Sequence, residues 1–424
     1  MTFLPEHRTL SPTFVSMANK APTPKGTSPL GIPALLLETL AHFIDDGNTA
    51  DRALNETFRK YKIRDQEQRS ELALRFYGII RFWRPLVTAL GEDKFETLEQ
   101  IRRLIGAWNA WKKIYAGEKQ ENLTGPPAER LNKYMRVRKL RESYPDWLDA
   151  FAVEQVGEEN WEALSKALNK EPKLYLRTNT LKIKRELLMQ KLKAEGVEAF
   201  MHNASVDALI VKVYANVFAL ESFHEGLFEV QDIASQRVSE FLDVHPGMRV
   251  ADACAGNGGK TLHIATLMQN KGKIVAMDIV QNKLDELRAR CTRNGIDLAE
   301  TKLINSPEVI RKMDGTFDRV LLDVPCTGTG VLRRNPDIRW RLYPEDVEEM
   351  VKKQQEILRE YSTLVKKEGK LVYATCSIFP CEGEEQVKRF LESNSDSWEL
   401  EEELRINPVS DDGDGFYLAR MKKK

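Results

Sequence analysis

The stretch Met248–Thr261, which reads M-R-V-A-D-A-C-A-G-N-G-G-K-T, constrains the fold of this chain more than any other. An apolar, strand-like run from Val250 to Cys254 leads into three glycines within four positions, and a helical pattern begins at Lys260. Such a turn needs glycine because its backbone adopts positive φ angles and lets a ligand approach closely, with the N–H groups of the helix N-terminus facing that ligand. The sequence therefore predicts a strand, a glycine turn and a helix that together bind a nucleotide-like cofactor.

Two other interpretations of this turn stay open on these residues alone. An ordinary β–α connection in an α/β domain shows the same pattern without binding a ligand. The segment Gly259-Lys260-Thr261 also matches the end of a phosphate-binding P-loop, G-x-x-x-x-G-K-[ST], but that motif requires glycine at position 254, where this chain has Cys254. A P-loop NTPase is therefore an alternative, in which Asp323 would hold magnesium.

Strand-like and helical segments alternate after the glycine turn. The predicted strands are 273–279, 301–304, 319–323 and 370–375, and the predicted helices lie near 282–293, 344–365 and 381–391. Regular alternation of strand and helix indicates a parallel, doubly wound sheet. The segments 398–404 and 416–421 are expected to close this sheet as an antiparallel pair.

The chain before the glycine turn divides by pattern into three parts. Residues 1–33 are rich in Pro, Ser, Thr and Lys and predict a flexible leader. Apolar residues at helical spacing in 34–144 predict an all-helical domain, and short strands around a helix at 184–194 predict a small α+β segment over 145–245. Residues 246–424 are predicted to form the doubly wound domain.

Basic and aromatic residues are interleaved in the helical part. Lys and Arg outnumber the acids between 102 and 141, and Trp108, Trp111 and Tyr115 lie among them. Such a surface can hold phosphates and stack bases, although a solvated helix face over buried aromatic residues gives the same pattern. Over the whole chain Lys plus Arg equals Asp plus Glu, at 64 each, so nucleic-acid binding would depend on local patches.

The cysteines and the apolar runs indicate a cytoplasmic protein. Five cysteines without paired spacing predict free thiols in a reducing compartment, and neither metal-ligand spacing, a signal peptide nor a run of membrane-spanning length is present. Cys291, inside a predicted helix, and Cys381, at a helix start, are expected to be ordinary buried residues. The protein is expected to bind no metal and no membrane.

Functional side chains gather at the predicted strand ends, where ligands of a doubly wound sheet bind. Asp278 ends the second strand about twenty residues after the glycine turn, a position from which a carboxylate accepts hydrogen bonds from ribose hydroxyls. The fourth strand ends at Asp323 and is followed by Cys326, and the fifth is followed by Cys376. Neighbouring strands lie about 4.8 Å apart, so adjacent fourth and fifth strands would place both thiols at one edge.

These residues carry a family resemblance. D-A-C-A-G-N-G-G-K-T, D-V-P-C-T-G-T-G-V-L-R-R-N-P-D-I-R-W and A-T-C-S-I-F-P-C-E-G-E-E resemble motifs of the Nop/Sun family of S-adenosylmethionine-dependent RNA cytosine-5 methyltransferases. L-R-T-N-T-L-K and G-L-F-E-V-Q-D-I-A-S-Q look like the segment before its catalytic domain, and 34–144 is similar to the NusB-like RNA-binding domain of its bacterial ribosomal small-subunit (RsmB-like) branch. The resemblance implies a Rossmann-like class I methyltransferase domain after a small α+β segment and an all-helical domain.

The resemblance also implies a catalytic mechanism. Cys376 would add to carbon 6 of cytosine as a thiolate, because carbon 5 is too weak a nucleophile to take a methyl group unaided. Cys326 would assist removal of the carbon 5 proton and release of the adduct, and Asp323 would hold the base by its N3 and amino edge. Lys260 would add positive charge near the attacking sulfur. DNA cytosine methyltransferases also have a Pro-Cys dipeptide, but in those enzymes the cysteine beside the proline attacks.

The same resemblance assigns binding residues. The residues expected to hold S-adenosylmethionine are Cys254, Ala255, Gly256, Asn257, Gly258, Gly259, Lys260, Asp278, Asn305 and Asp323. Gly256 and Asn257 depart from the family's C-A-A-P-G-G-K-T, and Asn305 stands where many members carry an aspartate against the adenine. The residues expected to contact RNA are Arg333, Arg334, Arg339 and Trp340, with exposed loop surface as the alternative.

The expected substrate is 16S ribosomal RNA, with transfer RNA as an alternative, and the protein is expected to be a monomer. An inactive RNA-binding scaffold is a further alternative, which the presence of both cysteines disfavours.

Overall fold

The structure is a computed structural model that describes residues 30–46, 49–92, 94–118, 126–212 and 216–424. It divides the chain into two compact units, one of Met1–Asn169 with Asn335–Arg341 and one of Lys170–Arg334 with Leu342–Lys424. The predicted leader, 1–33, lies outside the described residues except for its end, where Ile32 and Pro33 begin helix α2. Among the described helices, none combines the length and the apolar character that a membrane crossing requires.

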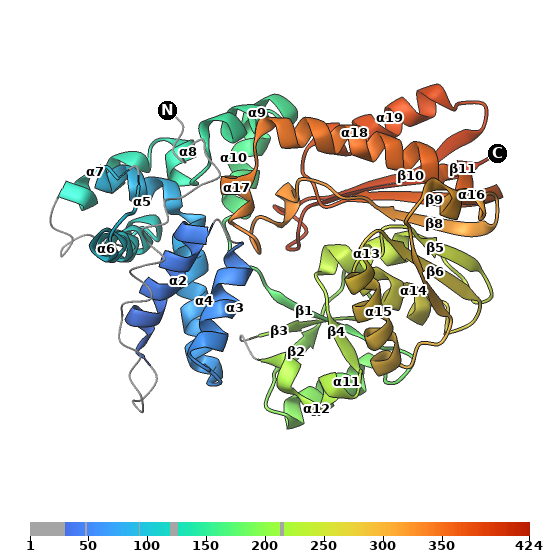
Figure 1. The fold of residues 1–424 in the computed structure, drawn as a ribbon, viewed down its shortest axis with the longest axis horizontal. Coiled ribbons are helices and arrows are strands. Elements are labelled where there is room, and N and C mark those ends of the chain that lie inside the picture. The colour runs from blue at the N-terminus through green and yellow to red at the C-terminus, as the bar shows by residue number, and fades with distance from the viewer. Residues whose placement is uncertain (1–29, 47–48, 93, 119–125, 213–215) are drawn as a thin grey trace. The chain divides into compact units, whose positions relative to one another are not determined.

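The first unit is helical, as the sequence predicts (Figure 1). Its described helices are α2 (Ile32–Asp46), α3 (Ala50–Lys60), α4 (Gln66–Arg81), α5 (Trp83–Leu90), α6 (Leu98–Tyr115), α7 (Pro126–Tyr134), α8 (Arg138–Arg141), α9 (Asp146–Val156), α10 (Glu158–Ala167) and α17 (Ile338–Arg341). A capping box starts α6, because the hydroxyl of Thr97 accepts from the amide of Gln100 and the side chain of Gln100 accepts from the amide of Thr97. Helices α9 and α10 group with this unit, because the unit extends to Asn169. The sequence pattern instead placed them in the segment 145–245.

The aromatic residues of α6 belong to the core of this unit. Trp111 has no exposed surface and Trp108 is 7% exposed. Both rings pack against Phe82, with centroid separations of 6.0 and 5.9 Å. The interpretation of these rings as a base-stacking surface is therefore wrong, and the alternative of buried aromatic residues under a solvated helix face is confirmed for them.

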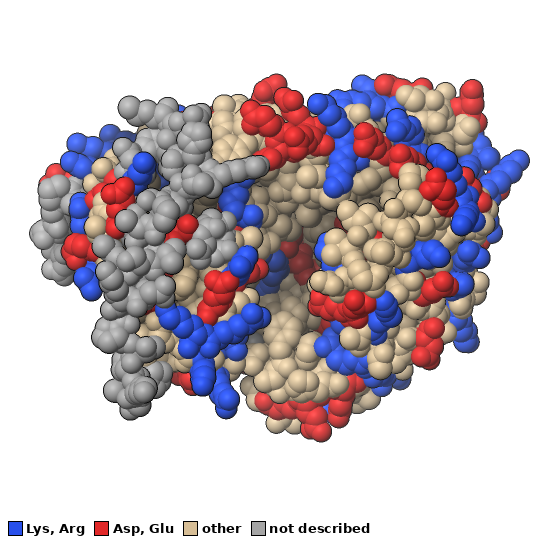
Figure 2. All heavy atoms as spheres, viewed as in Figure 1, with Lys and Arg blue, Asp and Glu red and all other residues tan. Residues whose placement is uncertain are grey.

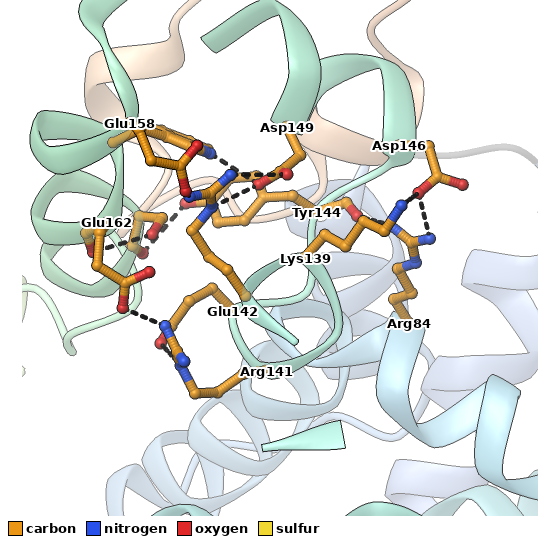
Figure 3. Close-up of polar contacts among 12 residues, drawn as sticks. Arg84, Lys139, Arg141, Glu142, Tyr144, Asp146, Asp149, Glu158 and Glu162 are labelled. Atoms are coloured by element: carbon orange, nitrogen blue, oxygen red, sulfur yellow. Dashed lines mark hydrogen bonds and ion pairs between the residues drawn. The ribbon is translucent and has the colours of Figure 1, made fainter. Parts of the chain in front are cut away.

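Part of the predicted basic cluster is bound to carboxylates inside the same unit (Figure 3). The pairs are Arg138 with Asp149 and Glu158, Arg141 with Glu142 and Glu162, and Lys139 with Asp146. They connect α8 to the start of α9, to α10 and to the residue that follows α8. The positive charges of these three side chains are therefore paired within the unit.

The charged side chains on one face of the molecule are of both signs. On the face drawn in Figure 2, Lys and Arg are interspersed with Asp and Glu over both units. This mixture agrees with a formal net charge of zero. Any attraction for RNA must therefore come from local groups rather than from the overall field of the protein.

The second unit begins with a small antiparallel sheet in the order β2-β3-β1-β4. Its elements are β1 (Leu174–Thr178), α11 (Arg185–Ala194), β2 (Ala199–Met201), β3 (Ala208–Val211), α12 (Glu221–His224), β4 (Phe228–Val230) and α13 (Ile233–Phe241). Leu188 and Leu192 of α11 are fully buried in one apolar cluster with Leu176 and Leu209 of the sheet. The helix predicted at 184–194 and the short strands around it are confirmed.

A larger sheet of seven strands follows, in the order β10-β11-β9-β8-β5-β6-β7 (Figure 1). Its strands are β5 (Arg249–Asp252), β6 (Lys273–Asp278), β7 (Ala299–Leu303), β8 (Phe317–Asp323), β9 (Val365–Thr375), β10 (Trp398–Ile406) and β11 (Phe416–Lys423). The helices between them are α14 (Gly259–Leu267), α15 (Gln281–Asn294), α16 (Pro307–Arg311), α18 (Pro344–Tyr361) and α19 (Glu384–Ser393). β5 to β9 pair in parallel, and β10 and β11 add the predicted antiparallel pair. The predicted doubly wound sheet is confirmed.

The strand order of this sheet reverses between β5 and β8. The chain passes from β5 outward to β6 and β7, then returns to build β8 and β9 on the other side of β5. A ligand of a doubly wound sheet binds at such a switch point, outside the carboxyl ends of the strands. Asp252 and Asp323 end the two strands there, and Asp323 lies opposite Ala374 of β9.

Candidate active site

The glycine turn between β5 and α14 has the backbone that the sequence predicts. Gly256 and Gly258 have φ angles of +53° and +84°. A Cβ atom on Gly258 would lie 2.5 Å from Cγ of Leu287, so no larger residue fits between the turn and α15. At Gly256 an added Cβ would meet no described atom within 4 Å, and its amide donates to Oδ2 of Asp278 at 2.9 Å. Leu287 of α15 thus closes the turn on the side of Gly258, whereas the side of Gly256 is open.

Three carboxylates lie at the ends of adjacent strands, Asp252 on β5, Asp278 on β6 and Asp323 on β8. Asp252 is 1% exposed, and its Oδ2 accepts from the hydroxyl of Thr261 at 2.6 Å, whereas its buried Oδ1 has no described hydrogen-bond partner. Burial raises the pKa of Asp252 to about 6, and the negative charges of Asp323 and Asp278 act in the same direction. This concentration of carboxylates favours a cationic ligand over a phosphate.

Lys260, in the first turn of α14, is bound to Asp323. Its Nζ donates to Oδ2 of Asp323 at 2.5 Å and lies 5.5 Å from the centroid of the Phe416 ring. Burial opposes the charge of Lys260, but Asp323 outweighs it and the pKa of the ammonium is raised above its ordinary value; negative charge on Cys376 would raise it further. Lys260 is therefore a cation within electrostatic reach of the Cys376 sulfur.

The structure brings the two predicted thiols together. Sγ of Cys326 lies 3.2 Å from Sγ of Cys376, and both residues are partly exposed. The hydrogen bond with Cys376, together with burial, raises the pKa of the Cys326 thiol well above its ordinary value. The amide of Gly330 donates to the carbonyl oxygen of Cys376 at 2.9 Å, a close approach of the two loops that a Cβ on Gly330 would block.

The other residues predicted to hold the cofactor line the same rim. Ala255 is 8% exposed, and Asn257 is exposed, with its carbonyl oxygen accepting from Arg290 at 2.7 Å. Burial raises the pKa of the Cys254 thiol, so it is a neutral group. Asn305 is exposed and follows Ile304, whose amide donates to the carbonyl oxygen of Asp278 at 3.0 Å. The structure thus gathers the turn, Asp278, Asn305, Asp323 and Lys260 at one edge.

Arg333 and Arg334 are committed to contacts within their own unit. Arg333 is 3% exposed and donates to the carbonyl oxygen of Pro408 at 3.0 Å. Arg334 pairs with Asp232 at 2.5 Å and with Asp414 at 2.7 Å, and although burial acts in the opposite direction, these carboxylates raise its pKa. The prediction that Arg333 contacts RNA is corrected by its burial, and the charge of Arg334 is already neutralised.

Arg339 and Trp340 lie in α17 and belong to the helical unit. Arg339 has no exposed surface, and its guanidinium lies 4.2 Å from the centroid of the Tyr144 ring. Its Nη1 donates to the carbonyl oxygens of Glu142 and Ser143 and to Oδ1 of Asn169, at 3.0 to 3.1 Å. Nε1 of Trp340 donates to the carbonyl oxygen of Ile80 at 2.7 Å. The RNA-contacting role predicted for Arg339 is therefore wrong, because a buried guanidinium cannot reach a phosphate, and the indole N–H of Trp340 is likewise occupied.

Two buried charged residues near the site were not assigned from the sequence. Arg177 of β1 is 2% exposed and donates to the carbonyl oxygen of Gly259 at 2.6 Å, which ties the small sheet to the glycine turn; burial lowers its pKa to about 10. Glu382 has no exposed surface and bonds the residues that follow the two cysteines. The sequence signal for Arg177 was its place in L-R-T-N-T-L-K. Glu382 gave no such signal, because an acidic residue just before a helix resembles an ordinary helix-capping residue.

The residues present fit S-adenosylmethionine, whose sulfonium and ammonium groups are cationic. The open side of Gly256, the partnerless Oδ1 of Asp252 and the carboxylate of Asp278 provide a backbone cradle and acceptors for a cation that also carries a ribose. Together with the doubly wound sheet, these features define a Rossmann-like, S-adenosylmethionine-binding methyltransferase fold.

Comparisons with known proteins identify the family. The family described as 16S rRNA methyltransferase RsmB/F matches residues 239–422, and an RsmF/B-like ferredoxin-like domain matches 144–218. The chain is 34% identical over 318 residues to ribosomal RNA small subunit methyltransferase B of Klebsiella pneumoniae, covering 72% of this chain and 70% of that protein. It is 33% identical over 308 residues to a probable ribosomal RNA small subunit methyltransferase B of Bacillus subtilis, covering 68% of each. The chain belongs to the RsmB/F family of the Nop/Sun methyltransferases.

Solved structures agree with this assignment. The crystal structure of PH0851 superposes with a TM-score of 0.75 at 26% identity and covers 95% of this chain and 100% of that one. A methyltransferase homologue from Pyrococcus horikoshii gives a TM-score of 0.60 at 26% identity, covering 68% of this chain and 98% of that one. The chain spans 66% of the length of the related methyltransferase of Proteus mirabilis, to which it is 33% identical.

Proposed function

We propose that this protein methylates carbon 5 of a cytosine in RNA, with 16S ribosomal RNA as the target, through a covalent adduct between Cys376 and the base. The observation that carries the proposal is the pair of sulfurs 3.2 Å apart at the rim where Lys260 is bonded to Asp323. A chemistry that needs one thiol to attack and another to assist requires two sulfurs at one base. The names of the related proteins support ribosomal RNA as the substrate class.

The cofactor site is proposed from the glycine turn and its neighbours. S-adenosylmethionine supplies an electrophilic methyl group when bound. We expect the turn 254–259 to hold it against bare backbone, Asp278 to accept hydrogen bonds from its ribose hydroxyls, and Asp252 to face its positive charge. We also expect Asn305, which is exposed at the same rim, to contact the adenine.

The chain's own residues then carry the reaction. Cys376 adds to carbon 6 of cytosine as a thiolate, with the positive charge of Lys260 within electrostatic reach of the attacking sulfur. Asp323 holds the N3 and amino edge of the base and stabilises positive charge on the ring. Cys326, whose pKa is raised, keeps its proton in the resting site. After carbon 5 has taken the methyl group, Cys326, once it has given its own proton to water, accepts the proton of carbon 5 as a thiolate. The electrons of that C–H bond restore the double bond between carbons 5 and 6, and the Cys376 sulfur leaves carbon 6 as a thiolate.

A P-loop NTPase is not supported by the same geometry. In a P-loop the lysine reaches the phosphates, whereas Lys260 is bonded to Asp323. The carboxylates of Asp252, Asp278 and Asp323 at the strand ends would repel a triphosphate. We therefore expect thermal stabilisation by S-adenosylmethionine and none by ATP.

Single-cysteine variants test the proposal. Cys376→Ala should abolish methyl transfer to 16S ribosomal RNA, and Cys326→Ala should accumulate an RNA–protein adduct that survives denaturing electrophoresis. Cys381→Ala, outside the pair, serves as the control and should retain activity. If Cys326→Ala abolishes addition while Cys376→Ala traps the adduct, the roles are reversed and the assignment fails. Mapping 5-methylcytosine in ribosomal and transfer RNA from cells with and without the protein separates the two targets.

A further inference from the structure

A buried carboxylate is hydrogen-bonded to both of the loops that carry the thiol pair. Glu382 belongs to the short turn Pro380–Glu382 before α19 and has no exposed surface. Such a group is stable only when hydrogen bonds replace the water that it has lost. Three of the donors that Glu382 uses come from the two loops that carry the cysteines, and a fourth is Gln354 of α18.

Four hydrogen bonds reach the carboxylate, two at each oxygen. Oε1 accepts from the amide of Thr327 at 2.9 Å and from Nε2 of Gln354 at 3.0 Å. Oε2 accepts from the hydroxyl of Thr327 at 2.6 Å and from that of Ser377 at 2.5 Å. Thr327 follows Cys326 in the chain and Ser377 follows Cys376. One side chain therefore connects the residue after each sulfur.

The surrounding polar groups extend this connection. The hydroxyls of Thr329 and Ser377 lie 3.1 Å apart, and the hydroxyl of Thr329 accepts from the amide of Ile378 at 3.2 Å. Nε2 of Gln354 also donates to the carbonyl oxygen of Pro325 at 2.9 Å. Thr329, Ser377 and Gln354 are fully buried, so water does not compete for these bonds. The two loops are thus joined by a closed network centred on Glu382.

We propose that Glu382 is a positioning residue, which holds the sulfurs of Cys326 and Cys376 in register by tying their two loops to one buried carboxylate. That the relative position of the two sulfurs matters for turnover rests on the proposed function. That Glu382 fixes this position does not. All four donors need an acceptor, which both oxygens provide only in the carboxylate form. The raised pKa of Cys326 is caused mainly by its hydrogen bond with Cys376 and by burial, and the charge of Glu382 acts in the same direction.

Glu382→Gln is the variant that separates this role from simple packing. Glutamine has the same shape but turns one acceptor into an NH2 group that faces donors, and it removes the charge. The matched control is Glu385→Gln, which removes a carboxylate three residues further on that is 43% exposed and paired with Arg389. Ser377→Ala, which deletes one donor and keeps the carboxylate, is a milder variant that remains informative if Glu382→Gln does not fold.

The relative position of the two sulfurs can be tested without RNA. Phenylarsine oxide binds two thiols only when they are close together, and it should bind the wild-type protein and Glu385→Gln equally and Cys326→Ala hardly at all. We expect Glu382→Gln to bind it about tenfold more weakly and Ser377→Ala to lie between, since a bond to a buried charged group is worth about tenfold or more. In Glu382→Gln, alkylation of Cys326 by iodoacetamide should begin at lower pH because the pKa of this thiol falls.

Turnover provides the second measurement. Glu382→Gln should lower kcat for methyl transfer about 100-fold, as a misplacement of reacting groups by about 1 Å does, while the affinity for S-adenosylmethionine stays that of the wild type. A folded Glu382→Gln with wild-type arsenical binding, alkylation profile and kcat overturns the inference, as does a folded Ser377→Ala without any of these changes if Glu382→Gln does not fold. Weakened arsenical binding in a protein whose wild type methylates no cytosine would instead overturn the proposed function and leave the positioning role standing.

Discussion

Arg339 of the helical unit is fully buried and Lys260 of the second unit is partly buried, and these two cations are held in different ways. Arg339 of the helical unit is bound by carbonyl oxygens, an amide oxygen and the ring of Tyr144, and burial lowers its pKa. Lys260 of the second unit is bound by a carboxylate beside two sulfurs, and its pKa is raised against the effect of burial. The partners of Arg339 do not change charge, whereas those of Lys260 are groups proposed to react. Burial of a charge therefore does not identify a functional residue; its partners do.

This comparison predicts opposite results for the two cations, and the largest effect is expected at Lys260. Lys260→Met should lower the rate of methyl transfer about 10²- to 10³-fold, since it removes a preorganised charge from the site. The measurement is single-turnover transfer of labelled methyl to RNA at saturating S-adenosylmethionine. Lys388→Met, an exposed lysine on α19, should keep the wild-type rate. A Lys260→Met protein with wild-type turnover would show that Lys260, like Arg339, is structural.

Arg339→Ala should show the complementary result. Its carbonyl and amide acceptors lose a charged donor inside the core, so the free energy of unfolding should fall by about 3 kcal/mol. Chemical denaturation measures the loss, and hydrogen exchange should place it in α2 to α10. The affinity for S-adenosylmethionine should stay unchanged, because no contact of Arg339 reaches the glycine turn. Unchanged stability with a lost cofactor affinity would contradict the division between the two cations.

Acid should act on the second unit through His263 of α14. His263 has no exposed surface, and burial lowers its pKa from 6.5 to about 4. Between these values the unfolded chain takes up a proton that the folded chain does not, so the free energy of unfolding decreases as the pH falls through this window. The contribution is about 2 kcal/mol at pH 5. Denaturation curves of His263→Leu and wild type, compared at pH 5 and pH 7, measure it, and parallel pH dependence of the two proteins would contradict it.

The smallest effect is expected for the exposed pair of Lys139 and Asp146 in the helical unit. Both side chains are nearly half exposed, at 43% and 46%, and water screens their attraction. Lys139→Ala should change the free energy of unfolding by less than about 0.5 kcal/mol, with no difference from wild type at high salt. A loss as large as that of Arg339→Ala would mean that the ion pairs of Figure 3 stabilise the unit as strongly as its buried cation does.

The fold of the second unit could be predicted from the sequence because its signals are local. The glycine turn, the buried strand runs and the helices between them lie within short windows, and a parallel sheet then dictates which strand ends meet. This is why the neighbouring positions of Cys326 and Cys376 could be inferred without knowing any contact. The antiparallel pair of β10 and β11 was likewise predicted, from the strand-like segments 398–404 and 416–421.

Other features could not be predicted because their causes lie far away in the sequence. The segment around Arg339 reads as a polar loop, and only contact with carbonyl oxygens almost two hundred residues earlier shows that it is buried. Glu382 has the appearance of a helix-start acid until Thr327 and Ser377 are seen to converge on it. For Trp108 and Trp111 the sequence allowed both a surface and a core position, and only packing against Phe82 distinguishes them.

The position of α17 has a consequence for biosynthesis. Residues 335–341 group with the helical unit although they are separated from its other helices by more than 160 residues of the second unit. A ribosome that adds about 5 to 20 residues per second has made α2 to α10 many seconds before it delivers Arg339 and Trp340. The helices that emerge first must therefore wait in an incomplete state for a late segment. A fragment that ends at Asn169 lacks this late segment. The helices of such a fragment should therefore be less stable than the same helices in the full-length chain.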